Sequence, residues 1–232
     1  MPWRVNGLDF RIDPNIRRLI PHQTEEHLFE FFRQHIRPGE IVIDVGSFLG
    51  IYPMHIARCV GSTGHVFAFE PTRTSYSILC QQLSWNGLES RVTPFCAALG
   101  EVAGPAKMSQ HKEEPYRNAL ADPRSNASDE ATVDMLTLDA FCDQRRIQPD
   151  WIRMDVQGYE FHVLRGARQL LKQYGKKLRI VVEVHPQCWD QVGMSKTKAL
   201  EFFEELGLIS TPVIPNRGLF EIDGHLLLEK AK

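Results

Sequence analysis

Residues 41–52 read IVIDVGSFLGIY, an apolar stretch that is interrupted by Asp44 and followed by two glycines. The apolar residues up to Val45 predict a short buried strand, and the residues after Gly50 predict a helix. Gly46 and Gly50 allow a tight turn between the two and let a ligand approach the backbone closely. Because ligands of open α/β sheets collect beyond the carboxyl ends of the strands, this bend is a candidate binding site.

Strand and helix patterns alternate along the rest of the chain. Further strands are predicted at residues 65–69, 91–98, 133–136, 151–154 and 178–184, and further helices at 24–36, 74–85, 137–146, 159–171 and 199–206. Such alternation predicts an α/β fold, in which helices cover both faces of a mostly parallel sheet. Pro94 removes a hydrogen-bond donor from its strand and so predicts a sheet edge. Two last strands around an Asp223-Gly224 turn predict an antiparallel C-terminal edge.

The length of 232 residues is enough for one domain with a substantial core, so we expect a single domain over residues 1–232. Residues 1–39 form its predicted N-terminal helical extension. Between residues 105 and 130 the periodic pattern gives way to polar sequence that is too long for an ordinary connection. This segment is predicted to be a lid or an insertion, which would close over an acceptor together with His22.

The composition excludes several classes of protein. Lys and Arg number 27 and Asp and Glu 29, which gives a net charge of −2 and no basic footprint for nucleic acid. The five cysteines are scattered and never spaced as C-x-x-C, and the histidines show no ligand spacing, so neither a disulfide framework nor a metal site is predicted. No N-terminal leader or membrane span is apparent, and we expect a cytoplasmic protein that does not bind a membrane.

The bend after the first strand lacks two familiar phosphate-binding motifs. A dinucleotide fingerprint counted from Gly46 would need glycines where Phe48 and Ile51 stand, and no P-loop motif occurs. Glu70, at the end of the next strand, is placed to accept the hydroxyls of a ribose. With Asp44 beside the turn, the site favours a cationic nucleoside over a polyphosphate. S-adenosylmethionine, which has a free ribose diol and a sulfonium, is such a ligand.

Several stretches resemble the FkbM-type methyltransferases, a branch of the class I, Rossmann-like enzymes that use S-adenosylmethionine. They are IVIDVGSFLGIY, VFAFEPTRTSYSILCQQLSWNG, TLDAFC, IRMDVQGYEFHVLRGARQLL and IVVEVHP, and they follow the family's order over most of residues 41–186. The resemblance implies a seven-stranded, mostly parallel sheet and a methyl transfer that yields S-adenosylhomocysteine.

The resemblance also implies which residues form the cofactor site. Asp44, Gly46 and Gly50 would shape the methionine end of the site, and Glu70 would hold the ribose. Ala97 would line the adenine, and Asp155 would face the reacting methyl. The full predicted set is Asp44, Gly46, Ser47, Gly50, Glu70, Pro71, Ala97 and Asp155. The chain departs from the family in having Phe48 where Asn is common and Gln157 where Glu is common.

An alcohol is a poor nucleophile until a base removes its proton, so O-methylation predicts an acid or imidazole at the strand ends. The candidates are Asp155, Glu160, Glu183 and His185, of which Asp155 and His185 follow core strands directly. We therefore predict direct displacement onto a hydroxyl of a sugar or other small molecule, with Asp155, His185 and Glu183 as catalytic residues. The alternatives are methylation of an amine or of a peptide or protein side chain, and a non-catalytic nucleoside-binding protein.

Each of these residues also has a plainer interpretation. Asp44 could cap the helix that follows it, and the two glycines could be turn residues without a ligand. Glu70 could be a solvated strand end. Glu183 and His185 could be a structural acid and a structural histidine. The sequence does not decide between these interpretations.

Overall fold

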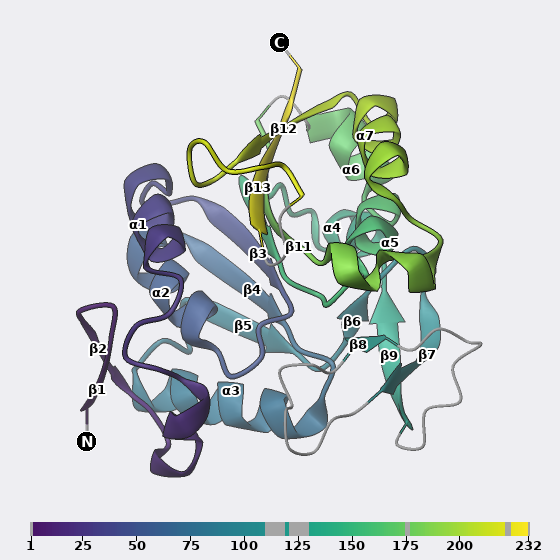
Figure 1. The fold of residues 1–232 in the computed structure, drawn as a ribbon. Coiled ribbons are helices and arrows are strands. Elements are labelled where there is room, and N and C mark those ends of the chain that lie inside the picture. Colours follow the sequence, from purple (N-terminus) through teal and green to yellow (C-terminus); the bar gives the residue numbers. More distant parts are fainter. Residues whose placement is uncertain (1, 110–118, 121–129, 175–176, 221–223, 232) are drawn as a thin grey trace. The chain divides into compact units, whose positions relative to one another are not determined.

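The computed structural model describes residues 2–109, 119–120, 130–174, 177–220 and 224–231. The chain divides into two compact units, Met1–Cys96 and Ala97–Lys232, and each is described by itself. Figure 1 shows the helices and strands of both units.

The first unit begins with an antiparallel hairpin and continues with alternating helices and strands. Its elements are β1 (Pro2–Val5), β2 (Leu8–Arg11), the 3-10 helix η1 (Pro14–Leu19), α1 (Glu26–His35), β3 (Ile41–Val45), α2 (Ile51–Val60), β4 (His65–Phe69), α3 (Arg73–Trp85) and β5 (Val92–Phe95). The sequence predicted α1 within the N-terminal extension but not the hairpin of β1 and β2, because their sequences, PWRV and LDFR, contain charged residues and no continuous apolar run.

Strands β3, β4 and β5 pair in parallel, and their buried residues form the core of this unit. The register pairs Asp44 of β3 with Ala68 of β4, and Ala68 in turn with Pro94 of β5. Within the unit β5 pairs only with β4, so the predicted edge position of Pro94 is confirmed. Val42, Ile43 and Val66 are fully buried, which fixes the end of β3 and the start of the glycine bend.

The second unit holds the remaining strands and helices. They are β6 (Ala98–Leu99), β7 (Gly104–Ser109), β8 (Ala119–Leu120), β9 (Glu130–Leu136), α4 (Leu138–Arg145), β10 (Trp151–Met154), α5 (Glu160–Arg165), α6 (Arg168–Tyr174), β11 (Arg179–Val184), the 3-10 helix η3 (Pro186–Val192), α7 (Lys196–Glu205), β12 (Leu208–Pro212) and β13 (Gly224–Lys230). Strands β10 and β11 are parallel, and β13 pairs antiparallel with both β11 and β12.

Part of the segment predicted as a lid is a strand. Residues 104–109 form β7, which pairs antiparallel with β9 in a four-stranded sheet of order β6-β9-β7-β8. Ala98, Met108 and Val133 pack together in a small apolar cluster there. Residues 110–118 and 121–129 lie outside the described residues, so the lid itself stays a prediction.

The helix predicted over residues 159–171 is broken into α5 and α6. The break falls at Gly166, where an added Cβ would lie 2.0 Å from the carbonyl oxygen of Gly100. The apolar spacing continues through the break, so the sequence pattern did not reveal it.

Three strands of the first unit and four of the second confirm the predicted α/β class. β3, β4 and β5 are parallel to one another, as are β10 and β11, and the last two strands of the chain provide the predicted antiparallel edge. Asp223 lies outside the described residues, so the turn before β13 stays a prediction.

Candidate active site

Asp44 is the next-to-last residue of β3 and lies inside the core of the first unit. Its side chain is fully buried, and the Ser47 hydroxyl donates to its Oδ2 over 2.6 Å. The predicted cofactor residue Ser47 is therefore engaged with Asp44 in this structure. The hydrogen bond from Ser47 holds the buried carboxyl group of Asp44 next to the bend.

The bend after β3 has three residues in the left-handed region. Gly46, Phe48 and Gly50 have φ of 82°, 48° and 90°. A Cβ on Gly50 would lie 2.6 Å from Cδ1 of Leu79 on α3. Gly50 is thus required by the turn and by helix packing, whatever ligand approaches the bend.

Glu70 follows β4 directly, and two backbone N–H groups hold its carboxylate. The Phe48 N–H donates to Oε2 over 2.9 Å, and the Thr72 N–H donates to Oε1 over 2.8 Å. The N–H of Glu70 itself donates to the carbonyl of Phe95. The backbone of Phe48, where the family commonly has Asn, therefore supports the predicted ribose acceptor without a side-chain hydrogen bond.

The surroundings of Glu70 disfavour its charge. The side chain is only 5% exposed, and burial, helped by the charge of Asp44, raises the pKa of Glu70 to about 7, although hydrogen bonds from Thr72 and Phe48 act in the opposite direction. A carboxylate offers about four acceptor positions, and the two N–H groups and the Thr72 hydroxyl fill three of them. One position remains to accept from a ribose hydroxyl, so the residues present fit a nucleoside with a free diol.

Two further residues of the predicted cofactor site follow strands β4 and β5 in the sequence. Pro71 is half-buried directly after Glu70. Ala97 is 7% exposed and begins the second unit. The contact of Ala97 with adenine and that of Asp155 with the cofactor stay predictions.

In the second unit the three predicted catalytic residues lie together. Asp155 follows β10, Glu183 is in β11 and His185 follows β11. His185 Nε2 is 3.7 Å from Asp155 Oδ1 and 3.8 Å from Glu183 Oε1. The side chain of Gln157 lies among them, with its amide nitrogen 3.0 Å from both Asp155 Oδ1 and His185 Nε2.

His185 is buried against acids. Its Nδ1 is 2.6 Å from Oε1 of Glu160, which also accepts the N–H of Gly158 over 2.9 Å. Burial lowers the pKa of His185, but the hydrogen bond and charge of Glu160 and the charges of Asp155 and Glu183 outweigh it and raise this pKa to about 9. The three carboxylates, taken alone, therefore favour a protonated, cationic His185 ring. The ordinary pKa of histidine had suggested a neutral ring that can act as a base.

Two residues of this cluster were missed by sequence reasoning. Arg153 is 3% exposed and donates to Asp155 Oδ2 over 3.0 Å. His225 lies opposite Glu183 in the register of β11 and β13, with 3.5 Å between its Nε2 and Glu183 Oε2. A signal for Arg153 was its place inside an otherwise apolar strand, whereas His225 depended on a strand register that no local pattern gives.

The same cluster also bears on metal binding. Asp155, Glu183 and His185 each offer one ligand atom within 4.8 Å of the others. The Gln157 amide nitrogen lies within hydrogen-bond distance of two of these atoms and so occupies the space beside them. The expected absence of a metal stays a prediction.

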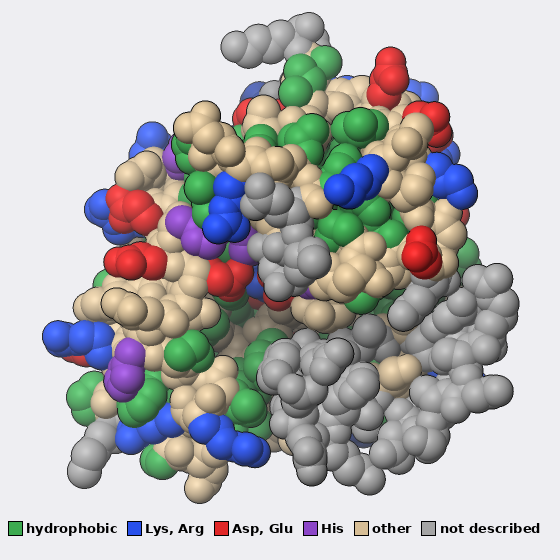
Figure 2. All heavy atoms as spheres, viewed as in Figure 1, with side chains coloured by type: hydrophobic (Ala, Val, Ile, Leu, Met, Phe, Trp, Pro, Cys, Tyr) green, Lys and Arg blue, Asp and Glu red, His purple; other side chains and the backbone are tan. Residues whose placement is uncertain are grey.

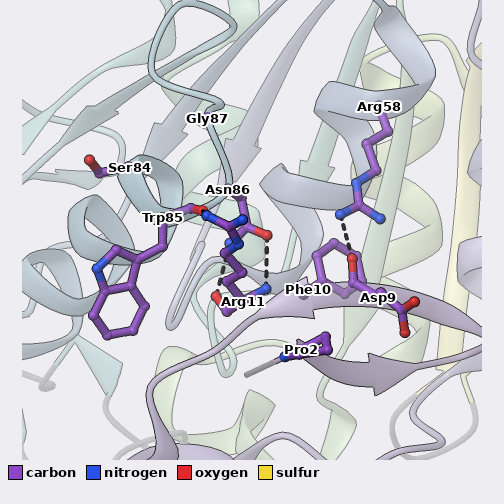
Figure 3. A pocket seen from close by; sticks show the side chains of 9 residues that line it. All are labelled: Pro2, Asp9, Phe10, Arg11, Arg58, Ser84, Trp85, Asn86 and Gly87. Carbon is purple, nitrogen blue, oxygen red and sulfur yellow. Dashed lines mark hydrogen bonds between the residues drawn. The ribbon is translucent and has the colours of Figure 1, made fainter.

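A separate hollow of the first unit contains no predicted site residue. It lies between the β1–β2 hairpin and the end of α3, and Figure 3 shows its lining. Asn86 exchanges hydrogen bonds with the backbone of Arg11, and Arg58 donates to the carbonyl of Asp9. These polar groups hold the hairpin in place, which is a structural role.

The α/β fold is that of the Rossmann-like methyltransferases. The chain belongs to the methyltransferase FkbM domain family, whose model matches residues 44–209. This confirms the resemblance seen in the sequence.

Known proteins support the same family. A curated relative, the hexuronic acid methyltransferase AglP of Haloferax volcanii, is 25% identical over 187 residues, which are 79% of this chain and 66% of the relative. The crystal structure of an FkbM methyltransferase from Methylobacillus flagellatus is similar with a TM-score of 0.54 at 16% identity, over 86% of this chain and 50% of that one. An S-adenosylmethionine-dependent O-methyltransferase from Thermotoga maritima gives a TM-score of 0.52 at 17% identity, over 94% and 69% of the two chains. The chain thus spans a half to two thirds of the first relatives it matches.

Among the described residues, no helix combines the length and the apolar character that crossing a bilayer requires.

Proposed function

We propose that the chain transfers the methyl group of S-adenosylmethionine to a hydroxyl of a sugar or of a similar hydroxylated small molecule. The observation that carries the proposal is the cluster of His185, Asp155 and Glu183, which gathers a histidine and two acids at strand ends. The similarity to a hexuronic acid methyltransferase supports a sugar acceptor, since a hexuronic acid carries several hydroxyls.

The residues of the first unit fit the binding step. Glu70 would accept the ribose hydroxyls while the N–H groups of Phe48 and Thr72 hold its carboxylate in place. The buried carboxylate of Asp44 would favour a cationic ligand near the bend. When bound, S-adenosylmethionine supplies a methyl group that is activated by its positive sulfur.

The residues of the second unit fit the proton transfer that an alcohol acceptor needs. As the hydroxyl oxygen bonds to the methyl carbon and the carbon–sulfur bond breaks, the hydroxyl proton passes to His185 Nε2 or to a carboxylate of Asp155. The leaving S-adenosylhomocysteine is neutral at sulfur, so no further reactant is required. A well-placed base typically contributes a factor of about 10² to 10⁴ in rate.

Transfer of a labelled methyl group tests this function. The protein is incubated with methyl-labelled S-adenosylmethionine and with hexuronic acids, neutral hexoses, amines and peptides as acceptors. We expect label in an O-methyl group of a sugar. His185→Ala should lower turnover by at least about tenfold with little change in cofactor affinity, and Asp155→Asn should lower turnover by at least about tenfold.

Exposed Glu204 on α7 provides the matched control, since Glu204→Gln changes one acid to an amide away from the cluster. Its turnover should equal that of the wild type. Label in amines or peptides alone would favour the N-methylation or side-chain alternative. Cofactor binding with no labelled product from any acceptor would favour the non-catalytic alternative.

A further inference from the structure

Gln157 lies in the turn between β10 and α5 in a conformation that side chains rarely adopt. Its φ is 51°, and that of the following Gly158 is 99°. The left-handed region is unfavourable for a residue other than glycine, so surrounding contacts have to hold it. In Gln157 these contacts include two hydrogen bonds of its side-chain amide.

The acids around Gln157 fix the direction of its amide. Arg153 donates to Oδ2 of Asp155, and Oδ1 of the same carboxylate lies 3.0 Å from the amide nitrogen of Gln157. A carboxylate only accepts hydrogen bonds, so the amide has to present its NH2 group to Oδ1. The opposite orientation would bring two oxygens together at this distance.

The same amide nitrogen also lies 3.0 Å from Nε2 of His185. Since an amide NH2 group only donates, Nε2 has to accept and therefore carries a lone pair. On the other side of the ring, Nδ1 is 2.6 Å from Glu160 Oε1, which can only accept from it as a carboxylate. The contacts thus describe a neutral imidazole with its proton on Nδ1.

We propose that Gln157 is a positioning residue that keeps His185 in this neutral form, with its Nε2 lone pair directed at the Gln157 amide until that amide turns away. The proposal deepens the proposed function, because a base is useful only if it is unprotonated when the hydroxyl arrives. Its structural part, the protonation state of His185, does not depend on methyl transfer.

Gln157 acts against the acids that face His185. Glu160 of α5, Asp155 after β10 and Glu183 of β11 all favour an imidazolium, and Arg153 and His225 lie beyond these acids. A proton on Nε2 would point at the NH2 group of Gln157, so it could enter only if the amide turned and left Asp155. A Glu at this position, as is common in the family, would instead accept from Nε2–H and favour the charged ring.

Two variants of nearly the same size separate these effects. Gln157→Met keeps the ring buried but removes the hydrogen-bond donor to Nε2. Protonation of Nε2 then becomes more favourable, because an N–H there would face the carboxylate of Asp155. Gln157→Glu replaces the donor by an acceptor. Both keep the left-handed backbone position occupied by a long, unbranched side chain.

The test is a titration of the His185 ring by nitrogen NMR on the full chain without cofactor, with the signals assigned by comparison with His185→Gln. In the neutral wild-type ring we expect the proton on Nδ1 and an unprotonated Nε2. The pKa of His185 should be higher by one unit or more in both Gln157→Met and Gln157→Glu. Equal pKa values in wild type and Gln157→Met, or a neutral ring protonated on Nε2, would overturn the proposal.

Once a methyl acceptor is found, the pH profile of turnover adds a second readout. The acidic limb should move to higher pH in both variants by as much as the NMR pKa moves. If no acceptor is methylated, the proposed function fails while the NMR result still decides the role of Gln157. A moved NMR pKa with an unmoved acidic limb would show that His185 is not the base.

Discussion

At the scale of single residues, Glu70 has the environment that its predicted role requires. It is buried and held by the N–H groups of Phe48 and Thr72, and its pKa is raised to about 7, chiefly by burial. Ribose hydroxyls donate to a carboxylate better than to a neutral acid. The charge state of Glu70 should therefore control nucleoside affinity near neutral pH.

We predict that the affinity for 5′-methylthioadenosine, which has a ribose diol and no group that titrates near pH 7, rises with pH. With a pKa of about 7, the ionised fraction of Glu70 rises from about one tenth at pH 6 to about nine tenths at pH 8, and the affinity should rise roughly tenfold. Calorimetric titration at both pH values measures it. Glu70→Gln should bind more weakly and without this pH dependence, and an equal pH dependence in that variant would contradict the role of Glu70.

Residues that end core strands could be predicted from the sequence, but their protonation could not. Asp44, Glu70, Asp155 and His185 each follow or end an apolar strand, and the structure finds them there. No sequence pattern indicates the distance between Gln157 and His185, because that contact joins the turn after β10 to the end of β11. The interpretation of His185 as an ordinary free base was incomplete for this reason.

At the scale of elements, the sequence predicted short apolar strands and the helix after the glycine bend well. Strands β3, β4 and β10 and helix α2 have the bounds that their apolar patterns indicated. The pattern failed where a distant backbone decides the local structure. The break between α5 and α6 falls at Gly166, which lies against the carbonyl of Gly100, 66 positions earlier (166 minus 100).

We predict that Gly166→Ala destabilises the protein by about 2 kcal/mol or more, because its Cβ would lie 2.0 Å from a backbone oxygen that cannot move independently. The φ of Gly166 is −74°, so a clash and not backbone strain is the cause. Urea denaturation of the two proteins measures the difference. Exposed Lys172→Ala on α6 is the control and should change the free energy of unfolding by less than about 0.5 kcal/mol. A stability of Gly166→Ala equal to that of the control would show that the backbone can yield at this contact.

At the scale of the whole molecule, the charge favours a small acceptor. The net charge is −2, and over the face shown in Figure 2 the basic side chains alternate with acidic ones and do not gather into a stripe. Nucleic-acid enzymes normally need a basic footprint for the phosphate backbone. The charge balance thus agrees with the sugar acceptor that we propose from the relative.

The fold class could be predicted from the sequence because alternating strands and helices allow few architectures. The division into two compact units and the sheet that contains β7 and β9 could not. Strand β7 has the sequence GPAKMS, in which glycine, proline and lysine mask the alternation of a strand. Its pairing with β9 depends on partners that lie about 20 or more residues away in the sequence.

The most direct measurement is the calorimetric titration of S-adenosylhomocysteine, at pH 8, into the wild type, Glu70→Ala and the exposed control Glu89→Gln. If the ribose is held by the acid at the end of β4, the wild type and the control bind equally and Glu70→Ala binds at least tenfold more weakly, which is about 1.4 kcal/mol. Equal affinity in Glu70→Ala, or no binding by the folded wild type, would contradict the central claim.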